Sequence, residues 1–276
     1  MLKEQMDKIM RPKAIAVIGA STKVHTIGSD MMKRLKEYNF TGDIYPVNPK
    51  GGEIQGFKAY TSVKEIPGNV DLAIIVIAQK FVLNAIDECH EKGIKGICII
   101  SAGFKEAGEE GAKAEKELVA KLKEYGMRCV GPNCLGVVNT APDIKMDGCF
   151  AESLPERGNI GFVSQSGALG GGILNILKDL NLGFAQFISI GNQADVNAET
   201  AIEYWENEDD VQQILLYMES IQNPANFRKL ATRITKKKPI LALKAGRSAA
   251  GASAASSHTG SLAGADKAAN ALLQQS

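Results

Sequence analysis

A stretch of small residues near the end of the chain contains a single imidazole. It runs from Ala245 to Gly264 and consists almost wholly of Gly, Ala and Ser, with Arg247 near its start and His258 near its far end. This composition predicts a mobile loop with little side-chain anchoring. A histidine on such an arm suits a group that must visit two places. The alternative interpretation is a solvated linker with an incidental histidine.

Polar motifs follow three other strand-like runs in the same half of the chain: Ser164-Gln165-Ser166-Gly167, Gly191–Asp195 and Glu219. In a parallel sheet these motifs and the His258 loop emerge on one edge, which predicts a shared site. The first motif opens a helix, and its backbone N–H groups, hydroxyls and helix dipole form a cradle for an anion. The Glu219 carboxylate can accept a hydrogen bond from one imidazole nitrogen and make the other more nucleophilic. The plainer alternatives are a helix cap at Ser166 and a solvated strand end at Glu219.

The elements that position these motifs alternate between strand and helix. Strands are expected at 159–163, 184–190, 213–218 and 239–243, with helices from 168 to about 180, at 198–207 and at 224–235. The first half shows the same alternation, with strands at 14–18, 44–47, 70–77, 96–100 and 127–130 and helices at 2–10, 28–38, 79–92 and 109–124. Residues 140–158, rich in Pro and Gly, are interpreted as the inter-domain connection. Continuous apolar strands separated by helices indicate an α/β protein with two doubly wound parallel sheets, covering residues 1–140 and 141–276.

Small or polar residues also end the strands of the first half, where such sheets bind ligands. They are Ser21, Asn48, Lys50, Gln79, Ser101, Gly103 and Asn133. A nucleotide-type ligand is therefore expected. NAD-binding sheets usually carry an acidic residue after the second strand, whereas this chain has Asn48-Pro49-Lys50. A lysine there suits a phosphate on the ribose, so NADP or coenzyme A fits better than NAD.

Composition excludes several function classes. The 276 residues carry a net charge of +1, so no broad electrostatic field for nucleic acid or an anionic membrane is expected. No apolar run approaches a membrane span, and the charged N-terminus has no signal-peptide pattern. The five cysteines form no CxxC pair and are interpreted as reduced thiols of a cytoplasmic protein. His25 and His90 are expected at the surface, and no metal site is predicted.

These motifs, in their order along the chain, resemble the acyl-CoA synthetases (NDP-forming), relatives of succinyl-CoA synthetase, and within them the acetate–CoA ligase (ADP-forming) group. The matching pieces are Val17–Ser21, Tyr45–Pro49, Ser101–Phe104, Gly131–Cys134, Ser164–Gly167, Ser189–Asp195 and Ser257–Gly264. They cover nearly the whole sequence.

The resemblance implies a Rossmann-like CoA-binding domain followed by a flavodoxin-like ligase domain. It implies that His258 is the phosphohistidine, Glu219 its supporting carboxylate, and Ser164–Gly167 the phosphate-binding helix start. The residues expected to contact coenzyme A are Gly19, Ala20, Ser21, Asn48, Pro49, Lys50, Ile77, Ser101, Ala102, Gly103 and Asn133. The implied reaction is acyl-CoA + ADP + phosphate giving carboxylate + ATP + CoA, with acetate or another small acid as the carboxylate.

The family also needs an ATP-grasp module to bind ADP or ATP with Mg, and nothing in the sequence resembles one. We therefore expect a separate beta subunit or a fused C-terminal domain, a hetero- or homo-oligomer, and a longer natural chain beyond the helix-like run that ends at Ser276. Two other functions stay open: the CoA- or acyl-CoA-sensing region of a protein lysine acetyltransferase, and an NADP-dependent oxidoreductase.

Overall fold

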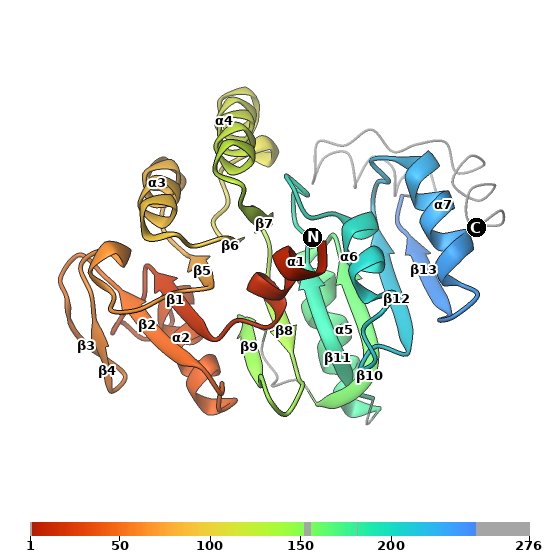
Figure 1. Cartoon of the computed structure of the whole chain (residues 1–276), viewed down its shortest axis with the longest axis horizontal. Helices are drawn as coiled ribbons and strands as arrows, with labels where there is room; N and C mark the ends of the chain where they lie inside the picture. The colour runs from red at the N-terminus through yellow and green to blue at the C-terminus, as the bar shows by residue number, and fades with distance from the viewer. Residues whose placement is uncertain (1, 152–155, 181, 247–276) are drawn as a thin grey trace.

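The computed structural model describes residues 2–151, 156–180 and 182–246. Two sheets lie side by side within this part of the chain (Figure 1). The first sheet consists of five parallel strands in the order β2-β1-β5-β6-β7, and the second of six strands in the order β13-β12-β10-β11-β8-β9. The prediction of an α/β fold with two doubly wound sheets is confirmed.

The first sheet forms from the apolar runs that the sequence predicts. Its strands are β1 (Ala14–Ile18), β2 (Asp43–Val47), β5 (Leu72–Ile75), β6 (Gly96–Ile99) and β7 (Arg128–Val130). A hairpin of β3 (Gly52–Ile54) and β4 (Phe57–Ala59) follows β2, and the sequence analysis missed it. Strand order reverses between β1 and β5, and such a reversal opens a ligand crevice at the carboxyl ends of the strands.

Helices cover both faces of this sheet because successive strand residues point to opposite sides. Side chains of α3 (Val82–Lys92) and α4 (Glu109–Tyr125) form one buried cluster with Ala16 and Ile18 of β1. Side chains of α1 (Leu2–Met10) and α2 (Ile27–Glu37) form another cluster with Ile15 and Val17. The short 3-10 turns are η1 (Val63–Glu65), η2 (Gln79–Phe81) and η3 (Lys105–Ala107).

The second sheet is built around β10 (Arg157–Ser164), with β11 (Phe184–Ser189) on one side and β12 (Gln213–Met218) and β13 (Ile240–Lys244) on the other. These four strands are parallel. α5 (Gly167–Asp179) packs on one face with Phe162 and Phe187. α6 (Ala198–Trp205) and α7 (Pro224–Ile234) pack on the other with Val163 and Ile188. Strand order reverses between β10 and β12, which opens a second crevice.

The segment interpreted as an inter-domain connection, residues 140–158, contains a strand of the second sheet, and another strand precedes it. β8 (Gly136–Asn139) and β9 (Met146–Cys149) pair antiparallel, and β8 adds antiparallel to β11, so both belong to the second sheet. The sequence analysis missed them because Pro142 and Asp147-Gly148 are typical of loops. The strands are stabilised by their partners: the fully buried Asp147 lies 2.7 Å from Arg34 of α2. Burial raises the pKa of Asp147 to about 6 against the opposing effect of the Arg34 charge.

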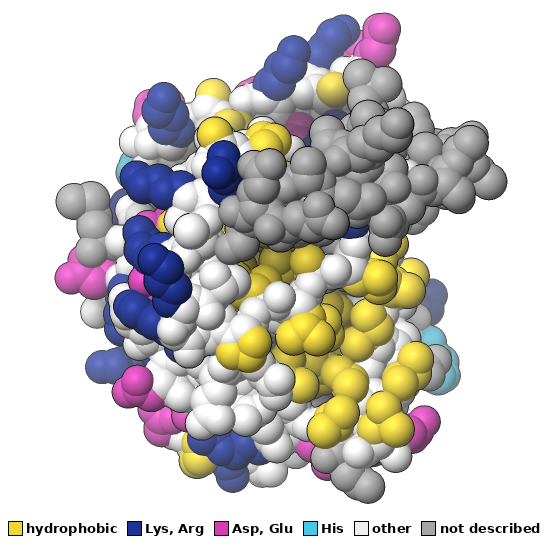
Figure 2. Space-filling model, turned by 90° about the vertical axis from the view of Figure 1, so that its right-hand side faces the viewer, with side chains coloured by type: hydrophobic (Ala, Val, Ile, Leu, Met, Phe, Trp, Pro, Cys, Tyr) yellow, Lys and Arg dark blue, Asp and Glu magenta, His cyan; other side chains and the backbone are white. Residues whose placement is uncertain are grey.

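A single buried cluster joins the two sheets. Met6 and Met10 of α1 lie in it with Ile74 of the first sheet and Met146 and Val163 of the second. At the far edge, β13 leaves Leu241 and Leu243 more than half exposed, on a face where Figure 2 shows many hydrophobic side chains. The apolar side chains of the cluster that joins the two sheets hold the two strand-end crevices in a fixed relation.

Candidate functional site

The loop after β1 packs against the loops that follow its neighbouring strands. Gly19 has φ +96°, and a Cβ there would lie 2.8 Å from the Val76 carbonyl oxygen. A glycine is required at this position because only it combines that backbone conformation with so close an approach. Asn48, after β2, donates from Nδ2 to the Ala20 carbonyl oxygen at 2.8 Å and accepts the Lys50 N–H at 2.9 Å. The expected ligand-binding residues of β1 and β2 are therefore adjacent.

The exposure of these residues differs. Pro49 and Lys50 are exposed and Ser21 is half-buried, where its hydroxyl accepts the Lys23 N–H at 3.0 Å. Ala20 is fully buried. His25, with φ 59°, is exposed in the same loop, and the exposed His90 stacks on Tyr125 with ring centroids 3.9 Å apart. The prediction of surface positions for both histidines is confirmed.

The start of α2 is closed by the backbone of the β1 loop. Thr26 caps this helix by accepting the Ser29 N–H at 3.3 Å. A Cβ added to Gly28 would lie only 2.0 Å from the Gly19 carbonyl oxygen. The contact of helix and loop therefore depends on the absence of a side chain at Gly28.

The loops after β5, β6 and β7 form the rest of this edge. The Ser101 hydroxyl donates to the Ile77 carbonyl oxygen at 2.5 Å, and the Asn133 N–H donates to the Ser101 carbonyl oxygen at 3.0 Å. Asn133 has φ 57°, a conformation that Asn adopts more readily than most residues. Its side-chain Nδ2 lies 3.3 Å from Oδ1 of Asn192, which follows β11 of the second sheet. Asn133 therefore links the two edges.

The opening of α5 has the geometry of a helix N-terminus that faces a crevice. Ser166 caps the helix by accepting the Leu169 N–H at 3.4 Å, and the Ser164 hydroxyl donates to the Ser166 carbonyl oxygen at 2.7 Å. The backbone N–H groups of Gly167 and Ala168, in the first turn, have no helical acceptor. A Cβ on Gly167 would meet no atom closer than Leu135 at 3.7 Å. This helix start is open where the start of α2 is closed.

Gln165 connects this helix start to the end of β12. Its Oε1 accepts the N–H groups of Glu219 and Ser220 at 2.8 and 3.0 Å. Glu219 is 6% exposed, and its Oε2 has no hydrogen-bond partner among the described residues. Burial raises the pKa of Tyr217, and the nearby Glu219 charge raises it further. A buried carboxylate oxygen without a partner is costly, which points to a group that it meets during function.

His258 and Arg247 lie outside the described residues, so the contact expected between His258 and Glu219 has no description here. Two of the other predicted motifs of this half meet, because Gly191 and Asn192 lie with Gln165 and Gly167 around one cavity. The third, Glu219, contacts Gln165 through its backbone N–H.

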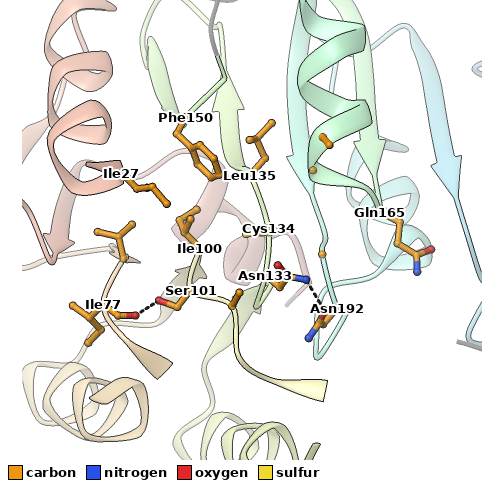
Figure 3. Close-up of a pocket in the computed structure, with 15 residues that line it drawn as sticks. Ile27, Ile77, Ile100, Ser101, Asn133, Cys134, Leu135, Phe150, Gln165 and Asn192 are labelled. Carbon is orange, nitrogen blue, oxygen red and sulfur yellow. Dashed lines mark hydrogen bonds between the residues drawn. The ribbon is translucent and has the colours of Figure 1, made fainter. Parts of the chain in front are cut away.

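This cavity has a volume of about 500 Å³ and lies where the carboxyl ends of both sheets face each other (Figure 3). Its lining includes the predicted residues Ile77, Ser101, Ala102, Asn133, Gln165 and Gly167. Gly19, Ala20, Ser21, Asn48, Pro49, Lys50, Gly103, Ser164, Ser166 and Glu219 are not among its lining residues. Other lining residues, among them Ile27, Leu135 and Phe150, have no role predicted from the sequence. Asn192 stood within a predicted strand-end motif, but Phe150 follows the missed strand β9.

Within the described ranges, no cluster of His, Cys, Asp or Glu has the arrangement of a metal site. All five cysteines are free and buried, with the sulfur atoms of Cys98 and Cys134 3.9 Å apart. In these same ranges no helix is both long and apolar enough to cross a membrane.

Fold and site define a class of protein: paired doubly wound α/β domains with a shared cavity at their facing strand ends. Two family models match the chain in that order. The model described as a CoA binding domain matches residues 13–140, and the one described as a succinyl-CoA ligase like flavodoxin domain matches residues 157–276.

Curated relatives and a solved structure agree with these matches. The acetate–CoA ligase (ADP-forming) II subunit alpha of Pyrococcus furiosus is 49% identical over 271 residues, covering 98% of this chain and 58% of that protein. The acetate–CoA ligase (ADP-forming) of Methanocaldococcus jannaschii is 43% identical over 262 residues, covering 95% of this chain and 36% of that protein. The dinucleotide forming acetyl-coenzyme A synthetase 1 of Ca. Korarchaeum cryptofilum, solved with phosphate and ADP, has a TM-score of 0.93 at 37% identity, covering 98% of this chain and 58% of that chain.

The chain therefore belongs to the acyl-CoA synthetase (NDP-forming) family, as its motifs implied. It spans a little over half of the Pyrococcus furiosus subunit and about a third of the Methanocaldococcus jannaschii protein. These relatives are ligases by name and give no support to the acetyltransferase alternative.

Proposed function

We propose that this chain is the CoA-binding and phosphoryl-transfer part of an enzyme that converts acyl-CoA, ADP and phosphate into a carboxylate, CoA and ATP, with acetate or another small acid as the carboxylate. The observation that carries the proposal is the cavity into which strand ends of both sheets open. A thioester held at the first edge would lie there beside the open helix start at Gly167. The acetate–CoA ligase names of the relatives support the same reaction.

Coenzyme A is the substrate assigned to the first edge. The residues proposed to contact it are Gly19, Ala20, Ser21, Asn48, Pro49, Lys50, Ile77, Ser101, Ala102, Gly103 and Asn133. All of them lie in the first of two proposed domains, residues 1–140 and 141–276. Gly19 and Gly103 have positive φ angles, a conformation that favours glycine in these loops, and the exposed Lys50 carries a cation suited to a ribose phosphate. The strand pairing of β8 with β11 favours placing the division a few residues earlier, before Gly136.

The proposed chemistry has three balanced transfers. Phosphate attacks the thioester carbonyl carbon and releases the CoA thiol, giving an acyl phosphate. The His258 imidazole takes the phosphoryl group and releases the carboxylate, and ADP then takes it to give ATP. Glu219 would hold the imidazole by a hydrogen bond to its second nitrogen, which gives its buried Oε2 a partner. At the proposed phosphate site Ser164–Gly167, the N–H groups of Gly167 and of the following turn of α5 would offset the charge of the phosphoryl group.

The nucleotide needs a further module. We propose an ATP-grasp beta subunit or fused C-terminal domain that supplies ADP and Mg, consistent with a chain that spans 58% of its Pyrococcus furiosus relative. The exposed Leu241 and Leu243 at the edge of the second sheet suit a contact with such a module or in a larger oligomer. A cytoplasmic location accords with five free cysteines.

Two measurements test this function. Calorimetry should show that the chain binds CoA more tightly than NADP or NAD, and binding of a dinucleotide without CoA would refute the assignment. Incubation with acetyl-CoA, radiolabelled phosphate and the ATP-grasp partner should then place an acid-labile, base-stable label on the wild type and none on His258→Ala. Equal labelling of both proteins would remove His258 from the mechanism.

A further inference from the structure

A buried polar network joins the two edges beside the cavity. It is formed by two carboxylates of the first domain, Glu106 in η3 and Glu115 in α4, and by the carboxamides of Asn192 and Asn133. Glu115 and Asn192 are 8% and 5% exposed. Neither carboxylate was singled out by the sequence, because both lie in a charged segment typical of a solvated helix.

Glu106 acts only as an acceptor in this network. Its Oε1 accepts the N–H groups of Gly103 and Phe104 at 2.6 and 3.1 Å, and its Oε2 accepts from Asn192 Nδ2 at 2.5 Å. Burial alone would raise the pKa of Glu106, but the hydrogen bonds from Asn192 and these backbone groups lower it below its usual value. The side chain is therefore ionised at neutral pH and has no proton to donate.

The two carboxylates fix the orientation of the Asn192 carboxamide. Asn192 Nδ2 donates to Glu106 and, at 2.8 Å, to Glu115 Oε2. Lys105 reinforces this arrangement, since its ammonium group donates to the Asn192 backbone carbonyl oxygen and lies 3.5 Å from Glu115. Because both N–H donors of the carboxamide face acceptors, its Oδ1 must face the other way.

That orientation passes to Asn133. Asn192 Oδ1 accepts from Asn133 Nδ2 at 3.3 Å, so the Asn133 carboxamide cannot turn its nitrogen to the cavity without losing this bond. Its side-chain oxygen is left on the side away from Asn192, and Asn133 is part of the cavity lining (Figure 3).

We infer, resting on the proposed function, that Glu106 is a positioning residue that acts through Asn192 to present the side-chain oxygen of Asn133 to the cavity. There the Asn133 oxygen accepts a hydrogen bond from an amide N–H of the pantetheine arm of coenzyme A. The strong donors of the arm are its amide N–H groups and a hydroxyl, and the amides lie nearer than the hydroxyl to the thiol, which is itself a weak donor. The inference adds Glu106, Glu115 and Asn192 to the site.

Glutamine at position 106 cannot replace the carboxylate. A Gln side chain has one acceptor oxygen and one NH₂ group, whereas Glu106 accepts three N–H groups on two oxygens. An NH₂ group would face either Gly103 and Phe104 or Asn192. In the second case Asn192 is no longer held in one orientation.

The test is a double-mutant cycle measured by calorimetry on the full chain. Glu106→Gln should weaken CoA binding about fivefold, the value of one neutral hydrogen bond. Asn133→Gly, chosen because glycine tolerates the positive φ, should weaken it similarly. Glu106→Gln should then add nothing in the Asn133→Gly background. Glu110→Gln, at the exposed start of the neighbouring helix α4, is the matched control and should bind CoA as the wild type does.

Three outcomes would overturn the inference. One is that Glu106→Gln weakens CoA binding equally in the wild-type and Asn133→Gly backgrounds, which would mean that Glu106 acts through a different residue. A second is a loss for CoA but not for desulfo-CoA, which keeps the amides and lacks the thiol. The third is measured on the free protein by NMR. The inference requires the side-chain amide signals of ¹⁵N-labelled Asn192 to shift in Glu106→Gln and to stay in place in Glu110→Gln. Unchanged Asn192 signals would refute the positioning role even if the wild type bound no CoA, a result that by itself refutes only the proposed function.

Discussion

The two crevices of this protein open at equivalent points of their sheets but are built differently. In the first, between β1 and β5, the loops pack backbone against backbone, and a Cβ on Gly28 would lie 2.0 Å from the Gly19 carbonyl oxygen. In the second, between β10 and β12, the helix start at Gly167 is open and the buried Glu219 has an oxygen without a partner in the described structure. The first crevice is organised to hold a ligand by shape, and the second contains a buried carboxylate oxygen that no described residue meets.

This difference has an energetic meaning. Close packing and internal hydrogen bonds, such as that of Asn48 to Ala20, stabilise the first crevice whether or not a ligand is present. An unpartnered buried polar atom costs about 1–3 kcal/mol, so a donor that meets Glu219 Oε2, which has no partner among the described residues, stabilises the second crevice. Sites that perform chemistry commonly retain such unsatisfied groups.

The largest effect is expected from alanine at the two helix starts. Gly28→Ala should destabilise the protein by about 3 kcal/mol or prevent folding, since its Cβ would meet backbone that cannot move aside. Gly167→Ala should stay within about 0.5 kcal/mol of the wild type because its Cβ meets nothing closer than 3.7 Å. Urea unfolding of both variants measures this contrast, and equal stabilities would show that the two helix starts are not built differently.

The next effect concerns catalysis without loss of stability. Glu219→Gln should slow phosphoryl transfer a hundredfold or more, as expected for removal of a charge that supports the nucleophile. Its melting temperature should not fall, because the change removes a buried charge with an oxygen that no described residue meets. Glu199→Gln is the control: Glu199 is 3% exposed in the same domain and accepts the Asn223 N–H at 3.2 Å, which a Gln carbonyl can also do. If Glu219→Gln slowed phosphoryl transfer and also lowered the melting temperature, the result would show that Glu219 has a structural role.

The sequence predicted the fold where the determining signal is local. Apolar runs such as Ala14–Ile18 form strands because every residue is buried between covering helices. The short strands β8 and β9 were missed because their position depends on partners, among them Arg34 for Asp147, that are distant in the chain. Strand ends alone were enough to predict Ser101 and Gln165 as candidate site residues, and both line the cavity. The contact of Asn192 with Glu106 joins a loop of one domain to a turn of the other, and no spacing in the sequence indicates it.

The smallest effect tests the electrostatics of the first crevice. Lys50 is exposed, so its attraction to a ribose phosphate is screened by water and salt, and Lys50→Ala should weaken CoA binding roughly threefold at low ionic strength. Dephospho-CoA, which lacks the 3′-phosphate, should bind the variant and the wild type equally. Lys58→Ala removes a neighbouring cation that lies over the Tyr60 ring, 5.1 Å from its centroid, and should leave both affinities unchanged. If Lys50→Ala weakened CoA and dephospho-CoA alike, the lysine would act on the loop of Asn48 rather than on the phosphate. The first crevice would then recognise its ligand by shape alone.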